Sequence, residues 1–165
     1  MSEKKYRVGI VPGSFDPITI GHLDIIKRAS ELCEDVFVAV MINDQKQYMF
    51  DLQSRLSIAK IACEGLYNVR VISSEGMLYE LARDLSAEVI IKGVRNDVDR
   101  KYEEKMAEYN SSMYPQAKTL LLEADKALTE ISSTSVRELI NSGAELCGYL
   151  PDAVIIKINK MRGNL

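Results

Sequence analysis

Five short apolar runs alternate with amphipathic stretches along this chain, and that alternation is what most constrains its fold. The runs are rich in branched residues and end at turn-forming or polar residues, which is typical of buried strands. They cover residues 7–11, 35–41, 68–73, 88–92 and 117–123. Strands that alternate with helices favour a parallel sheet with helices on both faces. We therefore predict an α/β fold, a Rossmann-like doubly wound domain with a five-stranded parallel sheet.

The stretches between the runs have apolar residues at helical spacing, and this predicts the helices of the fold. The expected helices cover residues 21–33, 51–66, 76–86, 99–113 and 133–141, and a last helix begins near Pro151. The chain has 165 residues, of which 47% are apolar, a size and composition that suit one hydrophobic core. We expect residues 1–165 to form a single domain.

The loops that leave the carboxyl ends of the strands are the expected place for a site. Right-handed crossovers bring these loops to one edge of a parallel sheet, where helix N-termini also point and favour phosphate. The segments concerned are residues 13–22, 42–50, 93–98 and 124–134. These segments contain glycines, hydroxyl side chains, basic residues and the histidine of the chain, so a phosphate-bearing ligand is expected there.

Charge and cysteine content narrow the classes of function. The net charge of -3 gives no overall basic excess, so a small phosphate-bearing molecule is a better ligand than a nucleic acid. Cys33, Cys63 and Cys147 are far apart and form no CxxC pair, which favours neither disulfides nor zinc. The apolar stretch that ends at Pro12 is too short for a secretory signal or a membrane span. We expect a cytoplasmic protein with no membrane or nucleic-acid partner.

Residues 12–22, PGSFDPITIGH, form the first motif. The glycines allow the backbone to approach a ligand closely, Ser14 supplies a hydroxyl, and His22 lies in the first turn of the next helix. A lone histidine more often caps or packs a helix, but its place after the first strand favours catalysis. The segment resembles the (H/T)xGH signature of the nucleotidyltransferase superfamily. Neither a Walker A loop nor GxGxxG is present, which argues against P-loop kinases and dinucleotide dehydrogenases.

Residues 131–138, ISSTSVRE, form a second motif that is similar to the ISSxxxR signature of the same superfamily. Hydroxyls and free N–H groups at a helix start can bind phosphate. The spacing of Ser135 and Glu138 also fits an ordinary capping box. Two signatures at opposite ends of an α/β chain together predict a binding site for a nucleoside triphosphate.

Thr19 occupies a position where many members of the superfamily have histidine, and the TxGH form resembles phosphopantetheine adenylyltransferases. The resemblance extends over Lys46, Met49-Phe50, residues 91–95, Tyr102-Glu103, Asn110 and Leu150-Pro151. It implies adenylyl transfer from ATP to 4'-phosphopantetheine, which gives dephospho-coenzyme A and pyrophosphate. It also implies a homohexamer and Mg²⁺, held mainly by ATP phosphates rather than by a protein site. Residues 99–103 read DRKYE where the family pattern is DFEYE.

The resemblance also implies roles for individual residues. The expected catalytic residues are His22, Lys46 and Arg95. The implied ATP-binding residues are Ser14, Phe15, His22, Gly93, Val94, Arg95, Glu103, Leu128, Thr129, Glu130, Ile131, Ser132, Ser133 and Thr134. The implied acceptor-binding residues are Ser14, Lys46, Met77, Leu78, Lys92 and Asn110.

Two other functions remain open from the sequence. One is another nucleotidyltransferase, which uses nicotinate mononucleotide or pairs CTP with an alcohol phosphate; Thr19 and the Lys46 loop argue against it. The other is a regulatory module that binds ATP or coenzyme A without turnover, against which His22, Lys46 and Arg95 argue.

Overall fold

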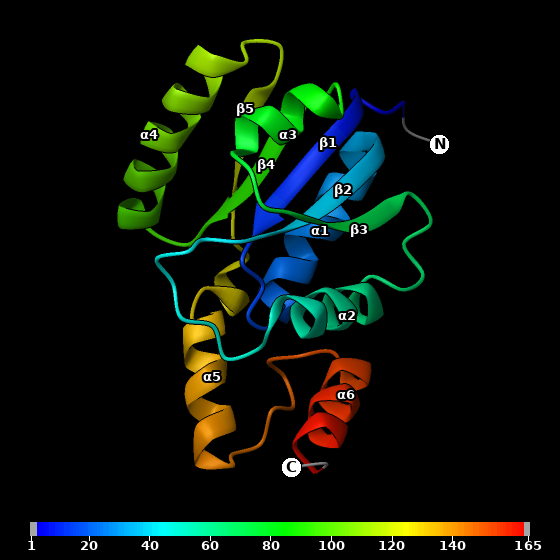
Figure 1. Ribbon diagram of the computed structural model, residues 1–165, viewed down its shortest axis with the longest axis vertical. Helices are drawn as coiled ribbons and strands as arrows, with labels where there is room; N and C mark the ends of the chain where they lie inside the picture. Colours follow the sequence, from blue (N-terminus) through cyan, green and yellow to red (C-terminus); the bar gives the residue numbers. More distant parts are fainter. Residues whose placement is uncertain (1–2, 164–165) are drawn as a thin grey trace.

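The computed structural model describes residues 3–163 and contains a five-stranded sheet in the order β3-β2-β1-β4-β5 (Figure 1). Every neighbouring pair of strands is parallel. The strands are β1 (Tyr6–Gly13), β2 (Cys33–Met41), β3 (Val69–Ser74), β4 (Val89–Val94) and β5 (Lys118–Glu123). The α/β class and the five-stranded parallel sheet predicted from the alternating pattern are confirmed.

Six α-helices and one short 3-10 helix are described. They are α1 (Ile20–Leu32), α2 (Leu52–Ala62), α3 (Leu78–Asp84), α4 (Asp97–Met113), η1 (Lys126–Leu128), α5 (Ser133–Ser142) and α6 (Asp152–Gly163). Two helices end earlier than their periodicity predicts. After α2, Gly65 has a φ of 89°, and after α3, Ser86 has a φ of 51°. A left-handed residue cannot continue a right-handed helix, so the chain turns at both places.

The sheet is covered on both faces, and alternate residues of its strands point into two different clusters. Val11, Val38 and Ile91 pack in the larger cluster, together with buried residues of α1, α2, α5 and α6. Ile10, Ala39 and Ile90 pack in the smaller cluster with Ala82 of α3. Helix α4 flanks β4 and β5 (Figure 1). This arrangement is the doubly wound one.

The strand order places a topological switch point beside β1. The chain runs from β1 to β2 and β3 on one side, and then crosses to β4 on the other side of β1. The loops that follow β1 and β4 therefore diverge, which opens a crevice at the carboxyl ends of these strands. Within residues 3–163, none of the helices is both long enough and apolar enough to span a membrane.

Candidate active site

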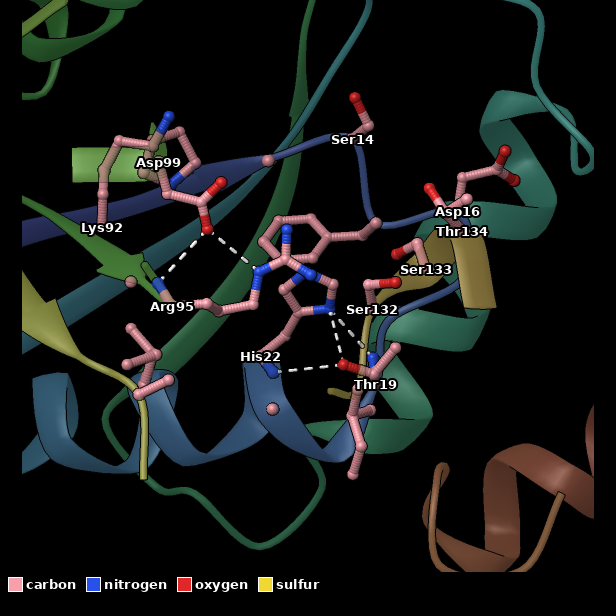
Figure 2. Close-up of a pocket in the computed structure, with 18 of the residues that line it drawn as sticks. Ser14, Asp16, Thr19, His22, Lys92, Arg95, Asp99, Ser132, Ser133 and Thr134 are labelled. Carbon is pink, nitrogen blue, oxygen red and sulfur yellow. Dashed lines mark hydrogen bonds and ion pairs between the residues drawn. The ribbon is translucent and has the colours of Figure 1, made fainter. Parts of the chain in front are cut away.

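A cavity of about 600 Å³ lies at this switch point. Side chains from both sequence motifs and from the segments after β2 and β4 line it. Figure 2 shows His22, Arg95 and Ser132 close together in this cavity. The predicted site residues in its lining are Ser14, Phe15, His22, Lys46, Lys92, Gly93, Arg95, Glu103, Leu128, Ile131, Ser132, Ser133 and Thr134. The fold thus brings together 13 of the positions that the sequence assigned to substrates.

Six predicted residues lie outside the lining of this cavity. Val94 is buried at the end of β4, and residues 129–130 lie between η1 and α5. Met77 and Leu78 are at the start of α3, and Asn110 is buried in the last turn of α4. The roles of these six residues, like the roles of the 13 in the lining, stay predictions.

The start of α1 fixes the ring of His22. Thr19 is the N-cap of α1, and its hydroxyl accepts the N–H of His22 at 3.3 Å. In return, His22 Nδ1 accepts the backbone N–H of Thr19 at 3.0 Å (Figure 2). Because Nδ1 is an acceptor in this bond, the proton of the neutral ring lies on Nε2. The rings of His22 and Phe15 also meet edge to face, with centroids 5.1 Å apart. The result is a rigidly held Nε2–H donor.

His22 is neutral over the physiological range. Burial, and next the positive charge of Arg95, lower the pKa of His22 from 6.5 to about 4. The ring therefore donates a hydrogen bond without carrying a charge of its own.

Helix α4 orients two basic side chains at the carboxyl end of β4. Asp99 accepts hydrogen bonds from the backbone N–H of Arg95 at 3.2 Å and from Arg95 Nε at 3.0 Å (Figure 2). One turn later, Glu103 forms an ion pair with Lys92, with Oε2 and Nζ 2.9 Å apart. Lys46 Nζ instead donates to the Ser14 hydroxyl at 3.4 Å. Two of the three cations are thus held by carboxylates of one helix face.

The second motif forms the N-terminus of α5. Ser132 is the N-cap, and its hydroxyl accepts the N–H of Ser135 at 3.0 Å while the Ser135 hydroxyl accepts the N–H of Ser132 at 3.1 Å. The alternative capping box of Ser135 and Glu138 does not form, because the helix begins three residues earlier than that spacing requires and its box pairs Ser132 with Ser135. The hydroxyl of Ser133 donates to the carbonyl of Pro17 at 2.8 Å, so the two motifs are directly joined.

Asp16 is a residue of the cavity wall that the sequence analysis missed. Its carboxylate is buried and accepts the backbone N–H groups of Met49 at 2.8 Å and Phe50 at 2.9 Å. Arg137 donates to the backbone carbonyl of Asp16 at 2.9 Å. Asp16 therefore ties the first motif to the Lys46 loop and to the second motif. Asp16 lies in the first motif and Arg137 in the second. Neither motif indicates these contacts, because the partners are remote in sequence.

Tyr48 and Asp99 also line the cavity, and the sequence predicted a role for neither. Tyr48 contacts Asn43 in the loop that carries Lys46, and Asp99 contacts Arg95. The Tyr48 hydroxyl accepts the N–H of Asn43 at 2.8 Å, a bond that closes the loop around Lys46. Asp99 matches the first residue of the DFEYE family pattern, and the departure from that pattern lies at Arg100 and Lys101. No sequence signal marked it as the partner of Arg95, although the i,i+4 spacing permits that contact.

The carboxylates of the cavity suit a metal that arrives with its substrate. Asp99 and Glu103 face cations, and Asp16 accepts two backbone hydrogen bonds. Within residues 3–163, His, Cys, Asp and Glu form no group of three that could hold a metal ion. A divalent cation coordinated mainly by phosphate oxygens and water fits these residues, as is usual for Mg²⁺.

A sheet whose switch point joins a neutral histidine, several cations and a helix N-terminus is suited to bind nucleotide phosphates, as a nucleotidyltransferase does. The pattern of the cytidylyltransferase-like family matches residues 10–139. A phosphopantetheine adenylyltransferase of Streptococcus equi subsp. zooepidemicus is 42% identical over 159 residues, which cover 96% of each chain. One of Heliobacterium modesticaldum is 36% identical, covering 95% of this chain and 94% of the other. The chain belongs to the cytidylyltransferase-like family and, within it, to the phosphopantetheine adenylyltransferases.

A solved structure from Vibrio parahaemolyticus, named "Putative Nicotinate-nucleotide Adenylyltransferase", has the same fold. The TM-score is 0.74, and the match covers 96% of this chain and 93% of the other. The sequences are 18% identical, so this likeness concerns the fold alone.

Proposed function

We propose that this chain transfers the adenylyl group of ATP to 4'-phosphopantetheine, giving dephospho-coenzyme A and pyrophosphate. A phosphate oxygen of the acceptor forms a bond to the α-phosphorus of ATP, and the bond from that phosphorus to the bridging α–β oxygen breaks. Pyrophosphate leaves with the electron pair of the broken bond. The observation that carries the proposal is the meeting of both signature motifs around His22 in one cavity.

His22 is proposed to stabilise the transition state. Negative charge builds up on the non-bridging oxygens of the α-phosphate, and a fixed N–H donor aimed at one of them lowers the barrier. The contacts with Thr19 leave Nε2–H as the free donor of the ring. Thr19 and His22 form the capping box of α1, which holds the ring in one orientation. A donor that is already oriented needs no reorganisation during the reaction.

The cations are proposed to divide between the two ends of the reaction. Lys46 and Lys92 bind the acceptor phosphate, and Arg95 with the N-terminus of α5 binds the departing pyrophosphate. Arg95 and Lys92 are supported for this by the carboxylates of α4, which hold them at the cavity. Ser14 accepts a hydrogen bond from Lys46 on the same wall of the cavity. We therefore place the Ser14 hydroxyl between the acceptor and the nucleotide.

The rest of ATP and the pantetheine arm are assigned to the flanks of the cavity. We place ATP along Phe15, residues 93–95, Glu103 and residues 128–134. We place the pantetheine arm between the start of α3 and the end of α4, where Met77, Leu78 and Asn110 lie. Helices α3 and α4 are neighbours there, because the rings of Tyr79 and Tyr109 meet edge to face with centroids 6.0 Å apart.

Mg²⁺ is proposed to accompany ATP and to neutralise charge on its phosphates, with no dedicated protein ligands.

A homohexamer is proposed from an apolar stripe on α4, in which Val98, Tyr102, Tyr109 and Met113 are exposed. Their spacing puts them on one side of the helix. We also propose a cytoplasmic location, because the three cysteines are free, and a single domain, because both clusters share one sheet.

The proposal is tested by measuring pyrophosphate release from ATP in the presence of Mg²⁺. The acceptors compared are 4'-phosphopantetheine, nicotinate mononucleotide and none, with CTP as the control nucleotide. We expect release with ATP and 4'-phosphopantetheine only. Release with a different nucleotide and acceptor would show that the enzyme uses another substrate. ATP binding without pyrophosphate release with any of the acceptors would favour a regulatory module.

A further inference from the structure

Arg55, on α2, is a buried cation that the proposed chemistry does not use. Its side chain ranks among the largest that are fully buried, and only 2% of the residue is exposed. Within residues 3–163 no carboxylate forms an ion pair with it. A buried charge without a counter-ion is costly unless dipoles or a bound anion compensate for it. The position of Arg55 behind the wall of the cavity therefore calls for an explanation.

The guanidinium of Arg55 binds the carboxyl ends of two strands. Its Nη1 donates to the carbonyl of Ser14 at 2.7 Å, just after β1, and to the carbonyl of Met41 at 3.1 Å, the last residue of β2. In a trans peptide the carbonyl and the next N–H point in opposite directions. The bond to the Ser14 carbonyl consequently directs the N–H of Phe15 away from α2.

Phe15 needs such support because its backbone is strained. It has a φ of 49°, in the left-handed region that a bulky residue rarely adopts. Strain of this kind persists only where surrounding contacts fix the backbone, and it gathers at functional sites. The preceding peptide is fixed by Arg55, and the Phe15 ring is buried against His22.

Arg55 also supports the loop that carries Lys46. Its guanidinium stacks on the ring of Tyr48, with the guanidinium carbon 3.8 Å from the ring centroid. The Tyr48 hydroxyl in turn accepts the N–H of Asn43, at the other end of the loop. One side chain thus contacts both the Ser14–Phe15 peptide and the Lys46 loop, which together form one wall of the cavity.

We propose that Arg55 is a positioning residue that holds the Ser14–Phe15 peptide and the Lys46 loop in the arrangement that binds substrate phosphates. The inference rests on the proposed function and deepens it. Arg55 contacts the residues that meet the phosphates, and it adds a buried positive charge behind them. Its loss displaces two phosphate-binding elements at once, and small displacements of such groups lower rates by about 10²-fold.

The test compares Arg55→Met with Arg55→Lys and with Ile58→Ala, all assayed below their Tm values. Ile58 is a fully buried residue one turn further along α2 and does not line the cavity, so its variant reports the effect of destabilising the helix alone. We expect Arg55→Met to lose about 10²-fold in kcat/KM, through both kcat and KM. Arg55→Lys, which keeps the charge and a donor, should recover much of that loss, and Ile58→Ala should stay within about twofold of the unchanged enzyme.

Binding of ATP without an acceptor, measured by calorimetry, supplies a readout that needs no turnover. We expect Arg55→Met to bind ATP more weakly than Ile58→Ala at the same Tm loss, because ATP is placed along the Phe15 backbone that Arg55 holds. Equal kcat/KM and equal ATP affinity in these two variants would overturn the inference. If Arg55→Met does not fold, Arg55→Gln takes its place with the same expectations. Absence of turnover in the unchanged enzyme would count against the proposed function, whereas the binding comparison would still test Arg55.

Discussion

At the scale of single residues, the site depends on groups held by backbone contacts. His22 is oriented by the N–H of Thr19, and Asp16 by its bonds to residues 49 and 50. The sequence predicted His22 because the motif around it has a characteristic spacing. It did not predict Asp16 or the Arg95–Asp99 pair, because a carboxylate in a loop or on a charged helix gives no local sign of its partner.

His22→Ala should lower kcat about 10²- to 10³-fold, because it removes one preorganised donor to the transition state. The affinity for ATP should change little, since the other contacts remain. His22→Gln, which can present an N–H near the same place, is the matched control and should be less impaired. Steady-state kinetics of pyrophosphate release provide the measurement. Near-normal kcat in His22→Ala would remove His22 from the mechanism.

The lowered pKa of His22 should make folding stability depend on pH. An unfolded chain binds a proton at His22 below about pH 6.5, whereas the folded protein resists until about pH 4. The contribution of His22 is therefore fully present above pH 6.5 and is lost as the pH falls toward 4. Urea unfolding of the protein and of His22→Gln at pH 7.5, 6.0 and 5.0 measures it. Parallel stability curves for the two proteins would contradict the shift.

At the scale of elements, α1 must pack closely on β4 for its histidine to reach the cavity. Gly93 permits this approach, because a Cβ at that position would lie 2.9 Å from Cγ1 of Ile25. The apolar runs and the helical spacing between them predicted each strand and each α-helix from local sequence, but not the 3-10 helix η1. They did not predict where α2 and α3 end. Gly65 after α2 and Ser86 after α3 adopt left-handed conformations, which a periodic pattern of apolar residues does not indicate.

Gly93→Ala should destabilise the protein by about 1–3 kcal/mol, the usual cost of an overpacked core. It should also lower kcat, because α1 moves away from β4 and takes His22 with it. Gly163→Ala, where an added Cβ meets nothing within 4 Å, is the control and should neither destabilise the protein nor lower kcat. Chemical denaturation and steady-state kinetics measure the two effects. An equally stable and active Gly93→Ala would show that the contact with Ile25 relaxes freely.

At the scale of the whole molecule, the sheet positions the site and α4 has two separate faces. One face presents Asp99 and Glu103 to the cavity, and another exposes the apolar stripe proposed as a subunit contact. The fold class and the edge of the sheet that carries the site were predictable, because both follow from the order of strands and helices. The oligomeric state is not encoded in such local patterns.

Sedimentation should find a particle of six chains. Tyr102→Asp, which places a charge in the centre of the stripe on α4, should dissociate it into smaller species. Tyr67→Asp is the control, because Tyr67 is 87% exposed and lies outside the stripe. A monomer in the unchanged protein, or equal dissociation by both variants, would refute the proposed contact.

The central claim is that the α-phosphorus of ATP is transferred and that its two outer phosphates leave together. It is tested by incubating the protein with 4'-phosphopantetheine, Mg²⁺ and ATP labelled at either the α- or the γ-phosphate. We predict that the α label appears in dephospho-coenzyme A and the γ label in pyrophosphate. Transfer of the γ label to the acceptor, or an α label that never joins the acceptor, would contradict the account.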